Sequence, residues 1–226
     1  MKRYCILIFL FFFSSLFAAT TTELENLVNK GISEKSFPGA QLYIGTDKET
    51  LLNKSFGKYT YEADSKDVAS YSLYDLASVT KVIATTAAIM QLYDNGKLNI
   101  NDNVWLYIPE FANNGKEDIR IVNLLLHNSG LKAWIPFYKT LKSKEEVLNS
   151  IYNISLDYKT GSKFVYSDLN AVLLGIIVER ISGLPLDKYC KLNIFEPLGM
   201  QNTMFVPGAE KKSMCVPTEN DSYWRM

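Results

Sequence analysis

The stretch Leu76-Ala-Ser-Val-Thr-Lys-Val82 opens a long uncharged segment that extends to Tyr93, and Lys81 is the only formal charge in it. Ser78 lies three residues before Lys81. The apolar pattern predicts a helix over residues 78–95 that ends at Gly96. Side chains at this spacing share one helix face, about 5 to 6 Å apart. The sequence therefore predicts that a hydroxyl and an amine meet at the start of a buried helix.

The chemistry of this pair follows from its position in the helix. A lysine in the first turn faces the positive end of the helix dipole, and the apolar residues after it indicate burial. Both effects predict a lowered pKa for Lys81, which suits a general base. The same dipole and the free backbone N–H groups favour negative charge at Ser78, so this serine has the surroundings of an activated nucleophile. The alternative is a serine that caps the helix and a lysine that extends to solvent.

Two other Ser-x-x-Lys pairs occur in the chain and serve as comparisons. Ser55 and Lys58 lie in a segment with strand character, where residues three apart point to opposite faces. Ser129 and Lys132 flank a glycine in a predicted turn. The spacing alone is therefore weak evidence, and only the pair in the helix at 78–95 places both side chains together.

Composition indicates a globular chain that can bury a core. It has 226 residues with 47% hydrophobic and 13% aromatic content, and its 24 basic residues balance its 24 acidic ones. The balance leaves no charge excess for nucleic acid, which we do not expect as a partner. Two strands precede most of the helices, which indicates an α/β (α+β) chain whose remaining strands come later. The other predicted elements are a helix at 22–36, strands at 40–46 and 49–62, and helices at 118–127, 144–154, 169–182 and 185–195.

The first residues have the pattern of a secretory signal peptide. Lys2 and Arg3 precede an apolar run that ends in Ala18 and Ala19. We therefore predict a signal peptide at 1–19, a periplasmic or secreted protein, and no stable membrane span after cleavage. An uncleaved anchor is the alternative, although the strongly apolar part is short for a bilayer. A lipoprotein would need a cysteine at the end of the run, whereas Cys5 lies at its start.

Two cysteines remain after the signal peptide, Cys190 and Cys215. In an oxidising compartment they either form one disulfide or stay as two partly buried thiols, and the sequence leaves both alternatives open. No metal-ligand spacing accompanies them. The sequence therefore predicts neither a disulfide framework nor a metal site.

A second motif, Tyr166-Ser-Asp168, stands directly before the mostly apolar segment LNAVLLGIIVERISG, where Ser167 or Asp168 is the expected N-cap of a helix. The order Ser78-Val-Thr-Lys81, LLLHNSGL at 124–131, Tyr166-Ser-Asp168 and IFEPLGM at 194–200 resembles the serine hydrolases of the class C β-lactamase and penicillin-binding-protein type. The resemblance covers nearly everything after the signal peptide.

The resemblance implies an enzyme with a role for each motif residue. Ser78 is then the acylated nucleophile, and Lys81 and Tyr166 share the base and acid roles. The position of Asp168 is usually asparagine in that family. A carboxylate there would raise the pKa of Lys81 and leave proton abstraction more to Tyr166. The implied reaction needs no cofactor and no metal.

The resemblance also implies the class of substrate. It is an ester, a D-alanyl amide or a β-lactam, hence a small-molecule or peptidoglycan-derived substrate. The aspartate at 168 favours an esterase or D,D-peptidase over a dedicated β-lactamase. A binding protein that keeps the pocket without turnover is the rival from a different class.

Two other motifs have structural interpretations. Lys159-Thr-Gly161 spells the third motif of the family but stands a few residues before Tyr166, where a turn is expected. His127, the only histidine, ends the segment IVNLLLH. We expect it to close a helix or pack its loop rather than to join a Ser-His-Asp triad.

The fold implied by the resemblance is a β-lactamase/transpeptidase-like sandwich with a helical subdomain. In that family the domain continues beyond the point that matches Met226 and supplies further sheet strands, a Lys- or His-Thr-Gly motif and a second oxyanion donor. We therefore expect residues 20–226 to form an incomplete domain that lacks its C-terminal sheet strands, and the chain as written not to be a competent enzyme.

Overall fold

The computed structural model describes residues 21–218, and they form two compact units. The hairpin unit contains residues 21–75 and 207–218, and the helical unit contains residues 76–206. The signal peptide predicted at 1–19 lies outside the described residues. The helical unit contains both predicted catalytic motifs.

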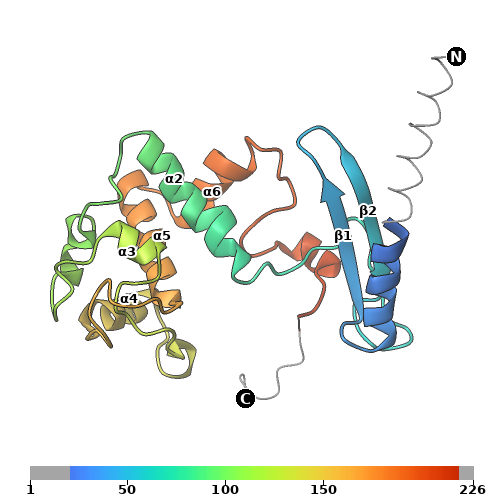
Figure 1. The fold of residues 1–226 in the computed structure, drawn as a ribbon, viewed down its shortest axis with the longest axis horizontal. Helices are drawn as coiled ribbons and strands as arrows, with labels where there is room; N and C mark the ends of the chain where they lie inside the picture. Colours follow the sequence, from blue (N-terminus) through green and yellow to red (C-terminus); the bar gives the residue numbers. More distant parts are fainter. Residues whose placement is uncertain (1–20, 219–226) are drawn as a thin grey trace, which may run out of the picture. The chain divides into compact units, whose positions relative to one another are not determined.

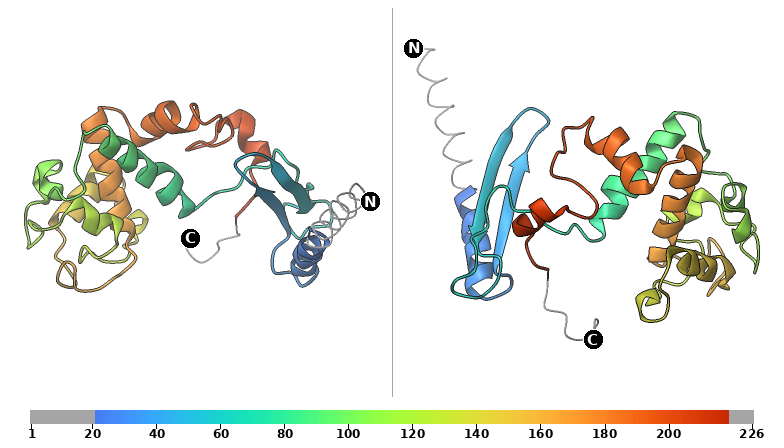
Figure 2. Two further views of the ribbon diagram at one scale, coloured as in Figure 1. Left: turned by 45° about the horizontal axis from the view of Figure 1, so that its top comes forward. Right: turned by 180° about the vertical axis from the view of Figure 1, so that it is seen from behind.

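The hairpin unit begins with a helix at 21–33 that lies beside a two-stranded antiparallel sheet (Figures 1 and 2). The sheet consists of β1 (Gly39–Gly45) and β2 (Thr50–Gly57), paired from Gly39 opposite Gly57. The helix is held to β2 by an ion pair between Glu25 and Lys54. Both strands were predicted from the sequence at these places.

The second strand is shorter than predicted, because it ends at Gly57 instead of continuing to residue 62. Gly57 has a φ of +66°, which turns the chain out of the sheet, and a Cβ there would meet the Pro38 carbonyl oxygen at 2.3 Å. The chain then forms turns, and residues 207–218 return to this unit through the short helix η6 (Ala209–Met214). The Tyr59 hydroxyl lies 2.9 Å from the Met214 carbonyl oxygen and fixes this return.

The helical unit is arranged around α5 (Asp168–Ser182), a helix of 15 residues. α5 packs against α3 (Ile121–Leu125), α6 (Leu186–Cys190) and the helix formed by η1 (Lys81–Thr86) and α2 (Ala87–Asp94), as Figures 1 and 2 show. Its apolar sequence explains this central position, because eight of its residues are buried. The remaining elements are η2 (Val104–Leu106), η3 (Pro109–Phe111), η4 (Phe137–Lys139), α4 (Lys144–Asn153) and η5 (Lys191–Phe195).

The predicted helices are present, with differences in their bounds, and the one predicted at 22–36 spans 21–33. The helix expected at 118–127 is confined to α3, because Arg120 is extended and pairs with Asn103. Helix 78–95 begins one residue later, at 79, and includes a π-helical turn at 81–86. α4 begins with the capping box of Ser143 and Glu146, and α6 continues into the π-helical turn η5.

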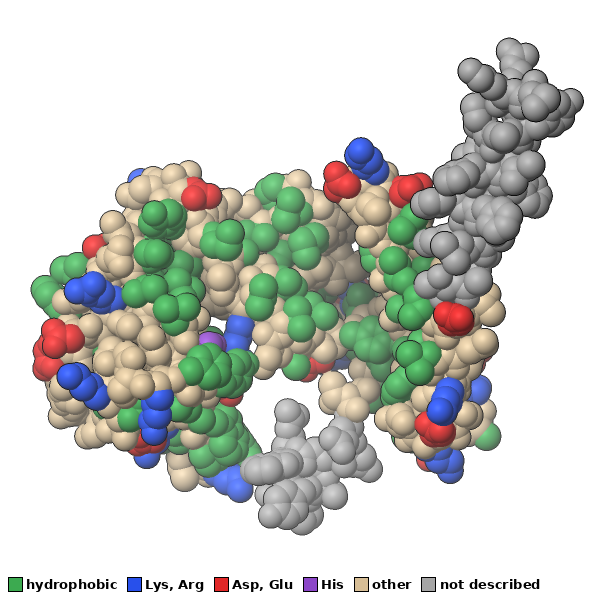
Figure 3. Space-filling model, viewed as in Figure 1, with side chains coloured by type: hydrophobic (Ala, Val, Ile, Leu, Met, Phe, Trp, Pro, Cys, Tyr) green, Lys and Arg blue, Asp and Glu red, His purple; other side chains and the backbone are tan. Residues whose placement is uncertain are grey.

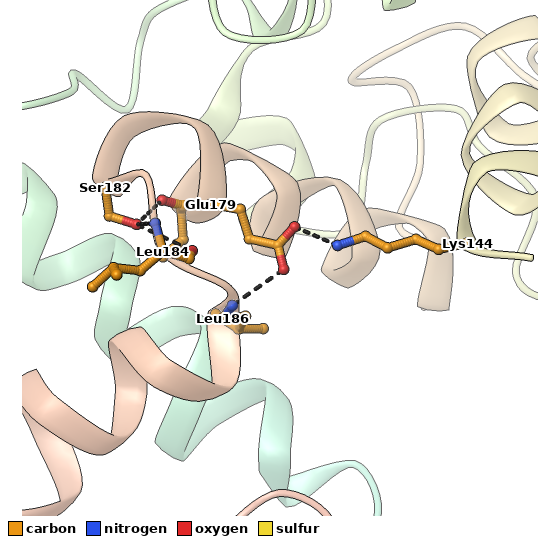
Figure 4. A network of polar contacts seen from close by, with 6 residues as sticks. Lys144, Glu179, Ser182, Leu184 and Leu186 are labelled. Carbon is orange, nitrogen blue, oxygen red and sulfur yellow. Dashed lines mark hydrogen bonds and ion pairs between the residues drawn. The ribbon is translucent and has the colours of Figure 1, made fainter.

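Glu179 connects three helices at the far end of α5 from the predicted site (Figure 4). One carboxylate oxygen accepts a hydrogen bond from the Lys144 amine at the start of α4, and the other accepts the Leu186 backbone N–H at the start of α6. Gly183, with a φ of +71°, ends α5 and lets the chain turn into α6. This end of α5 is therefore fixed by hydrogen bonds. The first residue of the helix, Asp168, lies at the opposite end, in the predicted site.

Cys190 is buried, Cys215 is half-buried, and both are free thiols.

Among residues 21–218 no single helix is long and apolar enough to span a membrane. α5 with residues 186–195 reaches that length and apolarity only as a pair bent by 74°.

Candidate active site

Ser78 stands immediately before the helix at 79–94, after a residue in an unusual conformation. Ala77 has a φ of +44°, in the left-handed region that costs energy for a residue with a Cβ. Lys81 then begins the π-helical turn η1, and its backbone N–H donates to the Ser78 carbonyl oxygen. Strained residues and π-helical turns are both frequent at functional sites. The local backbone thus presents Ser78 at the surface, directly ahead of the helix.

The amine of Lys81 lies at the centre of the site. Its Nζ donates to Ser78 Oγ at 3.0 Å and lies 2.8 Å from Asp168 Oδ1. The same Nζ is 5.1 Å from the centre of the Tyr166 ring. The structure therefore brings together all four residues named from the sequence, Ser78, Lys81, Tyr166 and Asp168.

The lowered pKa expected for Lys81 from its helix position is wrong. Partial burial does lower this pKa, but hydrogen bonds to Asp168 and Tyr166 outweigh burial and raise the pKa above its ordinary value. The side chain is 23% exposed, so desolvation is incomplete. The raised pKa that the resemblance implies for a lysine beside Asp168 is therefore the net direction, and Lys81 is an ammonium.

Tyr166 has the opposite shift. Its hydrogen bonding to Lys81, and then to Ser78, lowers the pKa of its phenol, while Asp168 opposes them. A nearby ammonium stabilises the phenolate, which is the form that accepts a proton. The tyrosine is 45% exposed and stands at the surface of the helical unit. Within this site Tyr166 is the group best suited to act as a base.

The segment 166–168 is held by the loop after α3. Ser167 is the N-cap of α5, but its hydroxyl donates to the Lys132 carbonyl oxygen at 2.6 Å instead of capping the helix. The Asp168 backbone N–H donates to the Ala133 carbonyl oxygen at 2.9 Å. These bonds fix the start of α5, so that Asp168 faces Lys81.

His127 contacts Tyr166 rather than Ser78 and does not form a triad. Its ring lies 4.8 Å from the Tyr166 ring, centre to centre, and its Nδ1 accepts the Ser167 backbone N–H at 3.0 Å. Burial and the charge of Lys81 lower the pKa of His127. The expected packing role is correct, but the contact with Tyr166 was missed. No spacing signal reveals it, since the partners are about forty positions apart in the chain.

The other sequence candidates are structural. Thr160 Oγ1 donates to the Ser129 carbonyl oxygen, and Gly161, with a φ of +78°, lies in a turn, so Lys159-Thr-Gly161 is the turn that was predicted. Ser129 is fully buried, and its hydroxyl bonds to Asn170 at 2.7 Å. Ser55 lies within β2. In the described part of the chain, no group of three or more His, Cys, Asp or Glu residues is placed to hold a metal ion.

Comparisons with known proteins match this arrangement. The sequence matches the beta-lactamase family over residues 24–221. N-acetylmuramyl-L-alanine amidase of Bacillus subtilis (strain 168) is 31% identical over 205 residues, which cover 82% of this chain and 46% of the relative. A Salmonella agona protein named "Putative D-alanyl-D-alanine carboxypeptidase" is 33% identical over 205 residues, with coverage of 81% and 46%.

Solved structures show the same fold. A class C beta lactamase is similar with a TM-score of 0.78 and 19% identity, over 88% of this chain and 55% of that chain. EstCE1, described as a hydrolase with promiscuous acyltransferase activity, is similar with a TM-score of 0.78 and 21% identity, over 89% and 56%. The β-lactamase/transpeptidase-like fold predicted from the sequence is confirmed.

The chain spans about half the length of the curated relatives it matches. The family match nevertheless extends over most of the chain and includes the Ser-Val-Thr-Lys and Tyr-Ser-Asp motifs. By this match, together with its site and its fold, the chain belongs to the beta-lactamase family of serine hydrolases.

Proposed function

We propose that this protein is an exported serine hydrolase that forms an acyl-enzyme on Ser78 and acts on an ester or a D-alanyl amide in preference to a β-lactam. The single observation that carries the proposal is the position of Lys81 Nζ, within 3.0 Å of Ser78 Oγ and 2.8 Å of Asp168 Oδ1. The names of the similar proteins, an amidase, a putative carboxypeptidase and a hydrolase with promiscuous acyltransferase activity, support acyl transfer. Export is supported by the sequence pattern of residues 1–19.

The protonation states of Lys81 and Tyr166 favour Tyr166 as the base. Lys81 donates to Ser78 Oγ as an ammonium and therefore has no lone pair to accept the serine proton. The phenol of Tyr166, with its lowered pKa, accepts that proton when it is ionised. Lys81 then acts through its positive charge, which stabilises the phenolate before the transfer and lowers the cost of charge on Ser78.

The reaction proceeds in two balanced halves. Ser78 Oγ forms a bond to the substrate carbonyl carbon as its proton moves to Tyr166, and the carbonyl oxygen takes the electron pair. The bond to the leaving alkoxide or amine then breaks, and Tyr166 returns the proton to it. A water molecule repeats both steps on the acyl-serine and releases the acid.

The Ser78 backbone N–H is placed to stabilise the oxyanion. It lies at the N-terminus of the helix at 79–94, where the first N–H groups have no acceptor within the helix and the dipole favours negative charge. One such donor contributes roughly 10²- to 10³-fold to the rate in enzymes that catalyse acyl transfer through an oxyanion. The serine thus supplies both the nucleophile and an oxyanion donor.

Covalent labelling tests the nucleophile. In a version of the protein extended to the full length of its relatives, a fluorophosphonate or a fluorescent penicillin is expected to label Ser78, and Ser78→Ala to abolish the labelling, because the attacking oxygen is removed. The measurement is gel fluorescence with peptide mapping of the labelled residue. Ser55→Ala is the matched control, since Ser55 has the same spacing to a lysine but lies in β2, and it should label like the parent protein.

The same experiment separates the proposal from its rival. Labelling that survives Ser78→Ala contradicts the assignment of the nucleophile. A folded protein that binds penicillin reversibly but never forms a covalent product at Ser78 is a binding protein, and the proposed hydrolysis is then wrong.

A further inference from the structure

We propose that His127 is a positioning residue for Tyr166 and that it acts as a neutral imidazole with its proton on Nε2. This inference rests on the proposed function, because it concerns how the proposed base is held. It assigns to the single histidine a role that neither packing nor a Ser-His-Asp triad describes.

His127 contacts each residue of the segment 164–167, which contains Tyr166. The ring of Phe164 meets the His127 ring edge-on at 6.0 Å, and the Val165 N–H donates to the His127 carbonyl oxygen at 2.8 Å. The ring of Tyr166 lies against the His127 ring at 4.8 Å with a tilt of 35°. The Ser167 N–H donates to Nδ1 at 3.0 Å. Tyr166 therefore lies between two backbone hydrogen bonds to one residue, with its ring supported by the same side chain.

The direction of the hydrogen bonds fixes the tautomer. The Leu131 N–H donates to Ser129 Oγ at 3.2 Å, and the Ser129 hydroxyl donates to Asn170 Oδ1 at 2.7 Å. Asn170 then directs its Nδ2 toward His127 Nδ1 at 3.3 Å. Backbone N–H groups can only donate, and the Ser167 N–H also points at Nδ1. Two donors face Nδ1, so this atom carries no proton and the proton of the neutral ring is on Nε2.

The backbone of His127 matches this role. Its φ is +52°, in the left-handed region, where histidine and asparagine are found more often than most residues with a Cβ. The conformation ends the helical segment of α3 and presents the carbonyl oxygen to Val165 and the ring to Tyr166. A substitution at 127 must therefore satisfy the backbone as well as the contacts.

Protonation of His127 would disrupt this support. A proton on Nδ1 would oppose the Ser167 N–H, and the ionisable groups that face the ring are Lys81, Asp168 and Tyr166. Burial and then the Lys81 charge lower the pKa of His127 below its ordinary value of 6.5, and Asp168 opposes them. The pKa of His127 is lower in the folded protein than its ordinary value. The stability that the neutral imidazole contributes is therefore fully present above pH 6.5 and is lost as the pH falls through the folded pKa.

Two variants separate the hydrogen bond from the ring. His127→Asn places an oxygen where Nδ1 was and tolerates the positive φ, whereas His127→Phe keeps a ring and removes the acceptor. We expect His127→Phe to slow the fluorophosphonate labelling of Ser78 by up to about 10²-fold, because a misplaced base costs that much. His127→Asn is expected to label at a rate much closer to that of the wild-type protein. It should also remove from the acidic limb of the pH–rate profile the part that results from titration of the imidazole.

Spectroscopy supplies a readout that does not depend on activity. Because the chain has one histidine, ¹⁵N-histidine labelling gives one imidazole, and the wild-type protein should show the Nε2–H tautomer at neutral pH. With ¹³C-tyrosine labelling, and Tyr166→Phe to assign the signal, the lowered pKa of Tyr166 should persist in His127→Asn and return toward its ordinary value in His127→Phe.

Either readout can overturn the proposal. A proton on Nδ1 in the wild-type protein contradicts it without any substitution. A Tyr166 pKa that is the same in the Asn and Phe variants, both folded by circular dichroism, also contradicts it. If wild-type Ser78 fails to label, the proposed function falls, but the tautomer and the Tyr166 titration still decide the role of His127.

Discussion

The carboxylate of Asp168 contributes to the raised pKa of Lys81. Burial lowers this pKa, but the hydrogen bonds to Asp168 and Tyr166 together outweigh burial and keep Lys81 an ammonium. The pair is partly exposed, with 23% of the Lys81 side chain and 42% of the Asp168 side chain accessible, so solvent screens it and its contribution to stability is at most about 1 kcal/mol. This ion pair therefore matters for the protonation of the site residues more than for the stability of the fold.

Asp168→Asn is expected to move the acidic limb of the pH–rate profile to lower pH. Hydrogen bonds from Lys81 and Ser78 lower the pKa of Tyr166 and the Asp168 charge opposes them, so removing that charge lowers this pKa further. A base with a lower pKa stays ionised at lower pH. The measurement is the rate of Ser78 labelling as a function of pH.

Asp157→Asn is the matched control for this prediction. Asp157 forms an ion pair with Lys132 at 3.0 Å and has a similar exposure, but it does not contact Lys81. Its removal should leave the pH profile unchanged. A profile that stays the same in Asp168→Asn, or moves equally in the two variants, would contradict the assignment.

At the same scale, the sequence predicted which four side chains lie together better than it predicted their protonation. The i, i+3 spacing of Ser78 and Lys81 was enough to place them on one face. Helix position gave the wrong direction for the Lys81 pKa, because the deciding partner, Asp168, comes from a helix nearly ninety residues later. The contact of His127 with Tyr166 is also long-range, and local patterns carry no information about it.

Among the elements, α5 joins the core to the site. Its first residue, Asp168, reaches Lys81, while its interior packs against α3, α6 and the helix that follows Ser78. Glu179 ties its other end to α4 and α6 (Figure 4). The placement of Asp168 therefore depends on how α5 is packed.

Leu173→Ala should destabilise the protein by about 2–5 kcal/mol, because Leu173 is fully buried in the core and alanine leaves a cavity. Val172→Ala is the matched control on the same helix. Val172 is 38% exposed, so its truncation should cost less than about 1 kcal/mol. Urea unfolding measures both as shifts in midpoint, with the slope unchanged. Equal losses in the two variants would contradict the packing described for α5.

The long elements were predictable because their apolar periodicity is strong. α4, with its capping box, and α5, which ends at Gly183, were located to within about one residue, which is the precision such signals allow. The shortening of α3 was not predictable, since it results from the pairing of Arg120 with Asn103. The π-helical turn at 81–86 also left no pattern that distinguishes it from an ordinary helix.

For the molecule as a whole, the apolar core is unevenly distributed. Every residue of the main buried cluster lies between 84 and 195, within the helical unit. The buried hydrophobic residues of the hairpin unit are Leu52, Tyr59 and Val68. Two strands on their own are marginal in water. Backbone hydrogen exchange should therefore be faster in β1 and β2 than in α5.

The surface of the helical unit also shows where sequence patterns reach their limit. Hydrophobic side chains gather over α2 and α6 in Figure 3, and Val79, Val82 and Met90 on the helix at 79–94 are all exposed. The sequence predicted a buried helix there. The division into two units was likewise not visible, because no linker composition marks the change at residues 75 and 76.

The concentration of the core predicts that residues 76–206 fold without the rest of the chain. This fragment contains the main buried cluster and the contacts of Lys81 with Ser78 and Asp168, and its length is ordinary for an independent domain. We expect a cooperative thermal transition with native near-ultraviolet circular dichroism. Leu173→Ala made in the fragment should lower its stability by about the same 2–5 kcal/mol as in the whole chain, because the cavity is lined by the same residues. A fragment with helical far-ultraviolet signal but no cooperative transition would be a molten globule, and it would show that the helical unit needs the hairpin unit to pack its core.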